Sequence, residues 1–165
     1  MKGIGGHHRG HRGGTDEWLT PPDILSKLGR FDLDPCSPVG RPWDTADAHL
    51  TVVNDGLSLP WLGRVWLNPP YGPEAIKWLG RLADHGNGIA LVFARTETEM
   101  FHAHVWPRAD AVLFIRGRLH FYTVAGERAK ANAGGPSVLI AYGEANVESL
   151  RRSDIPGRLV ILGRD

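Results

Sequence analysis

Five consecutive residues, Asn68-Pro69-Pro70-Tyr71-Gly72, form the part of the sequence best equipped for chemistry. Two adjacent prolines stiffen the backbone and supply no N–H, so this loop is rich in carbonyl acceptors. Asn68 adds a side-chain acceptor and Tyr71 adds a flat aromatic face. Such a loop suits a planar group that carries an NH2, because two acceptors can hold its hydrogens while the ring stacks on it. A rigid turn is the alternative, since Asn, Pro and Gly are common turn residues.

A strand leads into this loop and an amphipathic helix follows it. Arg64–Leu67 predicts a strand that the two prolines must end, and Pro73–Leu82 places apolar residues at helical spacing. Ile89–Ala94 is apolar throughout, which is typical of a central strand covered on both faces. Because ligands bind at the carboxyl ends of strands in such sheets, the loop at Asn68 stands where a site is expected.

The rest of the chain continues the alternation of helices and strands. Thr20 is expected to cap a short helix that has Pro21 in its first turn and ends at Gly29. Further strands are expected at 31–34, 51–53, 111–115, 119–122, 137–141 and 158–162, and further helices at 96–105 and 145–150. Strand–helix alternation with a strand-rich end predicts an α/β fold.

Composition and length set limits on the kind of protein. The chain has 165 residues, 42% hydrophobic and 22% charged, which predicts one globular domain and excludes a disordered chain. No apolar run reaches the ~20 residues of a membrane span, and the N-terminus lacks the apolar stretch of a signal peptide. With a single cysteine, Cys36, no internal disulfide can form. These features predict a cytoplasmic protein with no membrane partner.

Charge is distributed unevenly along the chain, although the formal net charge is only +1. Residues 1–14 carry three cations and no acid, in a Gly-rich segment expected to be a flexible basic tail. Residues 15–60 carry eight acids and three cations. A basic tail and a basic second half are compatible with an anionic partner, although many soluble enzymes scatter their charges in the same way.

Several basic side chains follow predicted strands. Arg95 and Thr96 come after the central strand, while Arg116, Arg118 and His120 surround Gly117. We expect contacts to nucleic-acid phosphates or base edges, with ordinary surface charge as the alternative for any single arginine.

Histidines do not predict a metal site. His7, His8 and His11 lie in the Gly-rich tail, and His102 and His104 alternate on a predicted helix, so that their side chains point apart.

The ordered set of motifs resembles the phage-type DNA adenine-N6 methyltransferases, which use S-adenosylmethionine. The similarity covers roughly residues 15–142. The matching segments are Asp16-Glu17-Trp18-Leu19-Thr20-Pro21-Pro22, Phe31-Asp32-Leu33-Asp34-Pro35-Cys36, Asp55-Gly56-Leu57, Pro60-Trp61, Val65-Trp66-Leu67-Asn68-Pro69-Pro70-Tyr71-Gly72, Ala94-Arg95-Thr96 and Arg116-Gly117-Arg118-Leu119-His120-Phe121. The resemblance implies a single-domain Rossmann-like methyltransferase fold over residues 15–165, with a mostly parallel sheet and a C-terminal antiparallel hairpin.

The resemblance also implies roles for individual residues. The catalytic tetrapeptide would be Asn68, Pro69, Pro70 and Tyr71. The cofactor-binding residues would be Trp18, Thr20, Pro21, Asp34, Pro35, Cys36 and Asp55. One departure is that Asp34-Pro35-Cys36-Ser37-Pro38 stands where many such enzymes have a Gly-rich turn after the first strand.

The implied activity is methyl transfer from S-adenosylmethionine to N6 of an adenine flipped out of DNA, in a phage or prophage and in the setting of restriction-modification. RNA adenine, cytosine N4 and a protein glutamine remain open as substrates, because each carries an NH2 on a planar group. A catalytically silent DNA-binding module is another alternative. Pro35-Cys36 also resembles the nucleophile of cytosine-C5 methyltransferases, whose chemistry has no use for the tetrapeptide.

The small size of the chain bears on specificity. After the cofactor fold, only the tail, a Gly-rich loop at 126–135 and the segment around Arg118 remain for DNA recognition. Specific protein–DNA interfaces bury about 1,000–2,500 Å² of protein surface. We therefore expect either a short, relaxed target sequence or a homodimer that shares the recognition.

Overall fold

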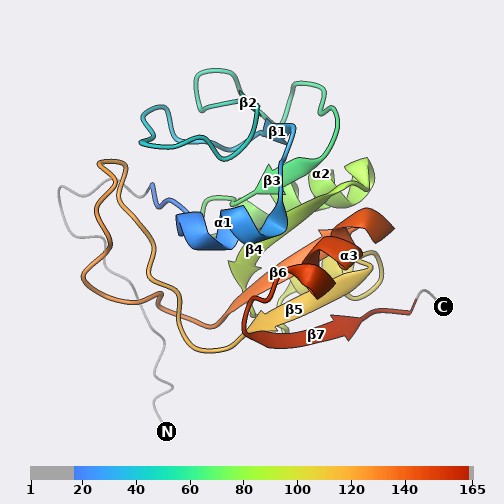
Figure 1. Ribbon diagram of the computed structural model, residues 1–165. Coiled ribbons are helices and arrows are strands. Elements are labelled where there is room, and N and C mark those ends of the chain that lie inside the picture. The colour runs from blue at the N-terminus through green and yellow to red at the C-terminus, as the bar shows by residue number, and fades with distance from the viewer. Residues whose placement is uncertain (1–16, 164–165) are drawn as a thin grey trace, which may run out of the picture.

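The computed structural model describes residues 17–163 as one mixed sheet with helices on both faces (Figure 1). The described strands are β1 (Leu33–Asp34), β2 (Ala48–His49), β3 (Val65–Leu67), β4 (Gly88–Phe93), β5 (Ala111–Ile115), β6 (Ser137–Tyr142) and β7 (Gly157–Ile161), in the sheet order β2-β1-β3-β4-β6-β5-β7. The described helices are α1 (Pro22–Leu28), α2 (Ala75–His85), α3 (Glu144–Arg152) and a short π-helix, η1 (Phe101–Val105).

The core consists of two apolar layers, one on each face of the sheet. On one face, α1 and α3 pack against alternate strand residues such as Trp66, Ile89 and Leu91. On the other face, α2 and η1 pack against the intervening residues, such as Val65 and Ala90. Because β3 and most of β4 are buried, both faces of these strands are apolar, and the prediction of a central strand at Ile89–Ala94 is confirmed.

The expectation of a mostly parallel sheet was wrong. Strands β1, β2, β3 and β4 pair in parallel, but β6 pairs antiparallel with both β4 and β5, and β7 pairs antiparallel with β5. The parallel strands β1 and β2 have only two residues each. Pro35 directly follows β1, and because proline has no N–H it cannot extend the ladder of hydrogen bonds. The antiparallel ladders are longer and therefore dominate the sheet, whereas the expected C-terminal antiparallel pair, β5 with β6, is present.

Four local predictions also differ from the structure. In place of the helix expected at 96–105, the described π-helix η1 covers only Phe101–Val105. Helix α1 has Pro21 rather than Thr20 as its N-cap and no side-chain cap. Residues 51–53 form a turn, with β2 just before them, and 119–122 form no strand beyond the two isolated bridges of Tyr122, to Leu19 and to Arg128. The basic tail at 1–14, with His7, His8 and His11, lies outside the described residues.

The strand order creates one position suited to a ligand. From β1 the chain moves outward to β2 and then returns past β1 to β3, so the order reverses between β1 and β3. Ligands in open α/β sheets bind outside the carboxyl ends of strands at such a reversal. Asp34 ends β1 and Asn68 follows β3, so the fold brings these two residues to the same edge.

Candidate active site

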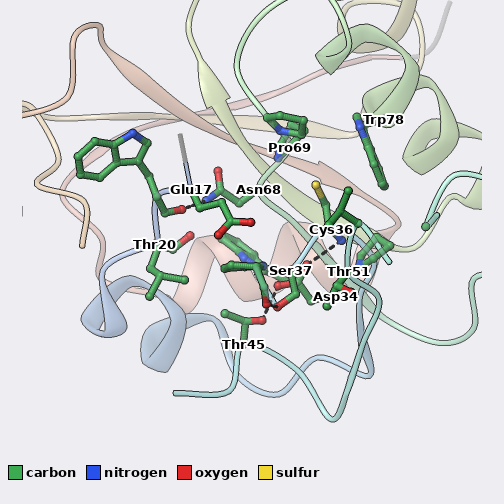
Figure 2. A pocket seen from close by; sticks show the side chains of 18 of the residues that line it. Glu17, Thr20, Asp34, Cys36, Ser37, Thr45, Thr51, Asn68, Pro69 and Trp78 are labelled. Carbon is green, nitrogen blue, oxygen red and sulfur yellow. Dashed lines mark hydrogen bonds between the residues drawn. The ribbon is translucent and has the colours of Figure 1, made fainter. Parts of the chain in front are cut away.

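A cavity of about 360 Å³ opens at the carboxyl ends of β1 and β3 (Figure 2). This volume is within the range of small-molecule and cofactor sites. The lining residues are Glu17, Trp18, Leu19, Thr20, Asp34, Pro35, Cys36, Ser37, Pro38, Thr45, Thr51, Val52, Asp55, Gly56, Trp66, Asn68, Pro69, Pro70, Tyr71 and Trp78. All four residues predicted to be catalytic and six of the seven predicted to bind a cofactor line it, so segments far apart in the sequence meet around one space.

The side chain of Asn68 is oriented by a backbone group of the N-terminal segment. Its Nδ2 donates a hydrogen bond of 3.1 Å to the carbonyl oxygen of Trp18 (Figure 2). This contact assigns the amide nitrogen to Trp18 and leaves Oδ1 as the end available for another donor. Within residues 17–163, neither Oδ1 of Asn68 nor the carbonyl oxygen of Pro69 accepts a hydrogen bond. The site therefore offers two adjacent acceptors.

Tyr71 presents a partly exposed ring beside these acceptors. Its ring stacks on Phe93 with centroids 4.5 Å apart and an interplanar angle of 19°, and meets Phe121 edge-on at 6.2 Å. Phe93 is the last residue of β4, so the central strand supports the ring from behind. With 41% of Tyr71 exposed, part of its surface remains available to a planar ligand.

Asp34 is a buried carboxylate in the wall of the cavity. Only 3% of the residue is exposed, and burial raises its pKa from 3.8 to about 6. Hydrogen bonds from the Thr45 hydroxyl and from the Cys36 N–H, the latter 3.1 Å long, oppose this shift. Near neutral pH the carboxylate is therefore ionised and held in place by two donors.

The cavity carries negative charge. Glu17, Asp34 and Asp55 line it, whereas no lysine or arginine does so among the described residues. A low-dielectric wall with one sign of charge attracts the opposite sign. The site therefore favours a ligand that carries positive charge.

The thiol of Cys36 is not suited to nucleophilic attack. Burial, with smaller contributions from Asp34 and Glu17, raises its pKa to about 12. The thiolate is the reactive form of cysteine, and here it is disfavoured. This observation argues against the covalent chemistry of cytosine-C5 methyltransferases.

Comparison with known families gives a single result that covers most of the chain. The family model described as DNA N-6-adenine-methyltransferase (Dam) matches residues 10–151. The chain belongs to this family. No curated protein and no solved structure matches the chain.

The general activity of the Dam family is methylation of adenine N6, and its substrate is DNA. The matched residues include every segment that lines the cavity and end within α3. No helix in residues 17–163 has the length and apolar character to cross a membrane.

Ten of the residues that line the Dam-family cavity were not predicted as site residues, among them Trp78 and Gly56. Trp78 lines the cavity from α2, and its ring stacks on that of Trp61 with centroids 6.3 Å apart. Gly56 lets its loop approach the first strand, because a Cβ there would lie 2.0 Å from the carbonyl oxygen of Pro35. The position of Trp78 within a predicted amphipathic helix gave no indication of a cavity. Gly56, within the Asp55-Gly56-Leu57 motif, could have been singled out.

The remaining predicted residues of this Dam-family protein lie outside the cavity. Pro21, Arg118 and His120 line a second, neighbouring cavity. Arg95 lies over the ring of Phe93, with Cζ 5.8 Å from the centroid. Thr96 lies in the turn after β4, and its backbone carbonyl accepts a hydrogen bond from Trp106 Nε1. Arg116 directly follows β5 and is exposed.

Proposed function

We propose that this protein transfers a methyl group from S-adenosylmethionine to N6 of an adenine in DNA, in the cytoplasm of a bacterial or phage-infected cell. The observation that carries the proposal is the pair of free acceptors, Asn68 Oδ1 and the Pro69 carbonyl, at the end of β3. Trp18 fixes the amide of Asn68, so the acceptor is oriented before the base arrives. Such preorganisation lowers the cost of reaching the reactive geometry.

The two acceptors would act on the exocyclic nitrogen of adenine. This nitrogen is a poor nucleophile, because its lone pair is delocalised into the ring. Asn68 Oδ1 and the Pro69 carbonyl would each accept a hydrogen bond from one of its N–H groups, moving the nitrogen toward tetrahedral geometry and localising the lone pair. On gaining the methyl group, the nitrogen would release one proton to water. The contribution of the protein is then positioning and electrostatics, with no general-base histidine and no covalent intermediate.

Tyr71 would hold the target base by stacking. Atoms of a base inside a duplex are out of reach, so the adenine must leave the helix to meet Asn68. The Tyr71 ring is backed by Phe93 and partly exposed, as a stacking platform requires. Stacking on an aromatic side chain is worth about 1–3 kcal/mol per base.

The cavity fits S-adenosylmethionine in volume and charge. The acidic residues Glu17, Asp34 and Asp55 suit its ammonium and sulfonium charges, and Trp78 offers a flat face to its adenine. The hydroxyl of Thr20 is buried without a hydrogen-bond partner among the described residues, so it is free to bind a polar group. When bound, S-adenosylmethionine supplies an electrophilic methyl group on a positively charged sulfur. Trp18, Pro35 and Cys36 would complete the walls.

Replacement of Asn68 by alanine tests the proposal. We expect methylation to fall about 10²–10³-fold, because one preorganised polar contact to the reacting group is lost. Binding of S-adenosylmethionine, measured by calorimetry, should be retained, since Asp34 and Trp78 are unchanged. Host DNA from cells expressing either protein would be digested to nucleosides and its methylated adenine and cytosine quantified by mass spectrometry.

The same experiment separates the alternatives. Raised N6-methyladenine in DNA that disappears with Asn68→Ala supports the proposal. Cofactor binding without any change in DNA would contradict it and favour RNA adenine, a protein glutamine or a silent module. Methylated cytosine at N4 would keep the chemistry of Asn68 but change the base.

A further inference from the structure

A second cavity adjoins the active site on the other side of the N-terminal segment. Residues 17–20 line the first cavity, and Pro21–Ile24 line the second, opposite a loop that follows β5. Its volume is about 540 Å³. The lining residues are Pro21, Pro22, Asp23, Ile24, Arg118, Leu119, His120, Tyr122 and Arg128.

The loop side of this cavity carries positive charge that the protein leaves unneutralised. Neither Arg118 nor Arg128 forms an ion pair with a described carboxylate, and Asp23 is the one acid among the lining residues. Some arginines elsewhere do pair, as Arg30 does with Asp47 and Arg108 with Asp84, whereas Arg118 donates only a 3.4 Å hydrogen bond to the carbonyl oxygen of Ala133. The whole loop, residues 116–136, contains four cations and one acid. An unpaired arginine in a cavity suits a phosphate, which it can bind through two N–H groups.

His120 adds a buried nitrogen to this side. Its Nδ1 is shielded from solvent and has no hydrogen-bond partner among the described residues. A buried polar atom of this kind is usually satisfied by water or by a bound group. The cavity wall therefore includes two guanidinium groups and the His120 side chain, whose Nδ1 lies beneath the surface.

The loop is joined to the active site by backbone hydrogen bonds. Leu19 N donates to the Tyr122 carbonyl at 2.8 Å, and Tyr122 N donates to the Leu19 carbonyl at 3.0 Å. Leu19 directly follows Trp18, whose carbonyl orients Asn68. A group held by Arg118 and Arg128 would therefore lie next to the segment that forms one wall of the active site.

We propose that this second cavity is a subsite for a backbone phosphate of the DNA substrate, bound by Arg118, Arg128 and His120. The proposal rests on the proposed function, because it takes DNA to be the substrate. Phosphate contacts position a protein on the duplex without reading sequence. A phosphate at this place would set the register of the strand relative to Asn68 and Tyr71.

The test compares three charge-removing variants in a DNA-binding experiment. Arg128→Gln removes a cavity cation whose side chain makes no hydrogen bond within residues 17–163, so the fold should be unaffected. Lys130→Gln makes the same charge change in the same loop but outside the cavity, and Arg158→Gln does so on β7, at the far edge of the sheet. Affinity for a fluorescently labelled duplex would be measured by anisotropy between about 50 and 200 mM salt.

The logarithm of the DNA association constant falls linearly with the logarithm of the salt concentration. We expect Arg128→Gln to reduce the magnitude of this slope by about 0.9, the value for one phosphate contact. Affinity should fall for duplexes of different sequence alike, while Arg158→Gln leaves the slope unchanged. An unchanged slope for folded Arg128→Gln would overturn the subsite, as would an equal effect of Lys130→Gln, which would indicate general loop charge.

The failure of the subsite and the failure of the proposed function give different results. If wild-type protein methylates adenine but Arg128→Gln keeps the full slope, the subsite is wrong and the function stands. If Arg128→Gln lowers the slope but wild-type protein methylates no adenine, the phosphate subsite stands and the proposed function is wrong.

Discussion

At the scale of single residues, Asp34 gives the site a dependence on pH. Its carboxylate is buried in the cavity wall, and burial raises its pKa to about 6, against 3.8 in an exposed carboxyl. Between about pH 4 and pH 6 the folded protein therefore binds more protons at Asp34 than the unfolded chain does. Stability rises with pH only where the unfolded state binds more protons, so here the contribution of Asp34 to stability falls as pH rises through this window.

We predict that replacing Asp34 by asparagine removes this pH dependence. The free energy of unfolding of wild type, relative to Asp34→Asn, should decrease by about 2 kcal/mol between pH 4 and pH 7, since each pKa unit corresponds to about 1.4 kcal/mol and the unfolded carboxyl is already partly protonated at pH 4. Denaturant titrations of both proteins at several pH values would measure the difference. A difference that stays constant, or grows with pH, would show that the carboxylate is not held in a desolvated environment.

At the scale of elements, the cavity depends on a close approach between two loops. Gly56 lies directly against the Pro35 carbonyl, and the Trp61 indole donates a 2.7 Å hydrogen bond to the Gly56 carbonyl. The loop after β2 is thereby pressed onto the loop after β1. This contact supplies a close backbone approach in a protein that has no Gly-rich turn after its first strand.

A methyl group at Gly56 should push these loops apart. We predict that Gly56→Ala lowers stability by about 1–3 kcal/mol, the usual cost of overpacking, and weakens binding of S-adenosylmethionine. Gly40→Ala is the matched control, because a Cβ at Gly40 meets nothing within 4 Å. Thermal unfolding and calorimetric titration would measure both effects. Equal behaviour of the two variants would mean that the loops can separate without harm to the cavity.

Elements with strong apolar patterns were predictable from sequence, and elements held by distant contacts were not. The apolar run around Ile89 predicted a central strand because burial on both faces leaves a local signature. The position of β6 between β4 and β5 leaves no such signature, so strand direction was misjudged. The tetrapeptide Asn68–Tyr71 was recognisable from its residue types, whereas the orientation of Asn68 depends on Trp18, fifty residues earlier in the chain.

At the scale of the whole molecule, most of the chain is already committed to the fold and the first cavity. The sheet, its helices and the first cavity take up the greater part of the described chain, and the loop at 116–136 contributes Arg118 and Arg128 to the cavity beside the active site. An interface of about 1,000–2,500 Å² is large for this remainder. Small size therefore limits how many base pairs one copy can read.

We predict that the protein methylates adenine in a short, relaxed sequence, unless two copies act together. Methylated positions in plasmid DNA from expressing cells would be mapped by sequencing, and molecular mass in solution would be measured by light scattering. A short target with a monomer, or a longer target with a dimer, agrees with the prediction. A monomer that methylates one long, strictly defined site would contradict it.

The place of β6 in the sheet has a consequence for how the protein is made. The apolar strand β4 lies between β3 and β6, and β6 comprises residues 137–142. A ribosome adds about 5–20 residues per second, so β4 emerges seconds before its second neighbour exists. Throughout that interval one edge of the central strand is open to other chains. The Leu19–Tyr122 bridge forms late for the same reason. Asn68 is thus synthesised early, but it reaches its working orientation only when most of the chain has been made.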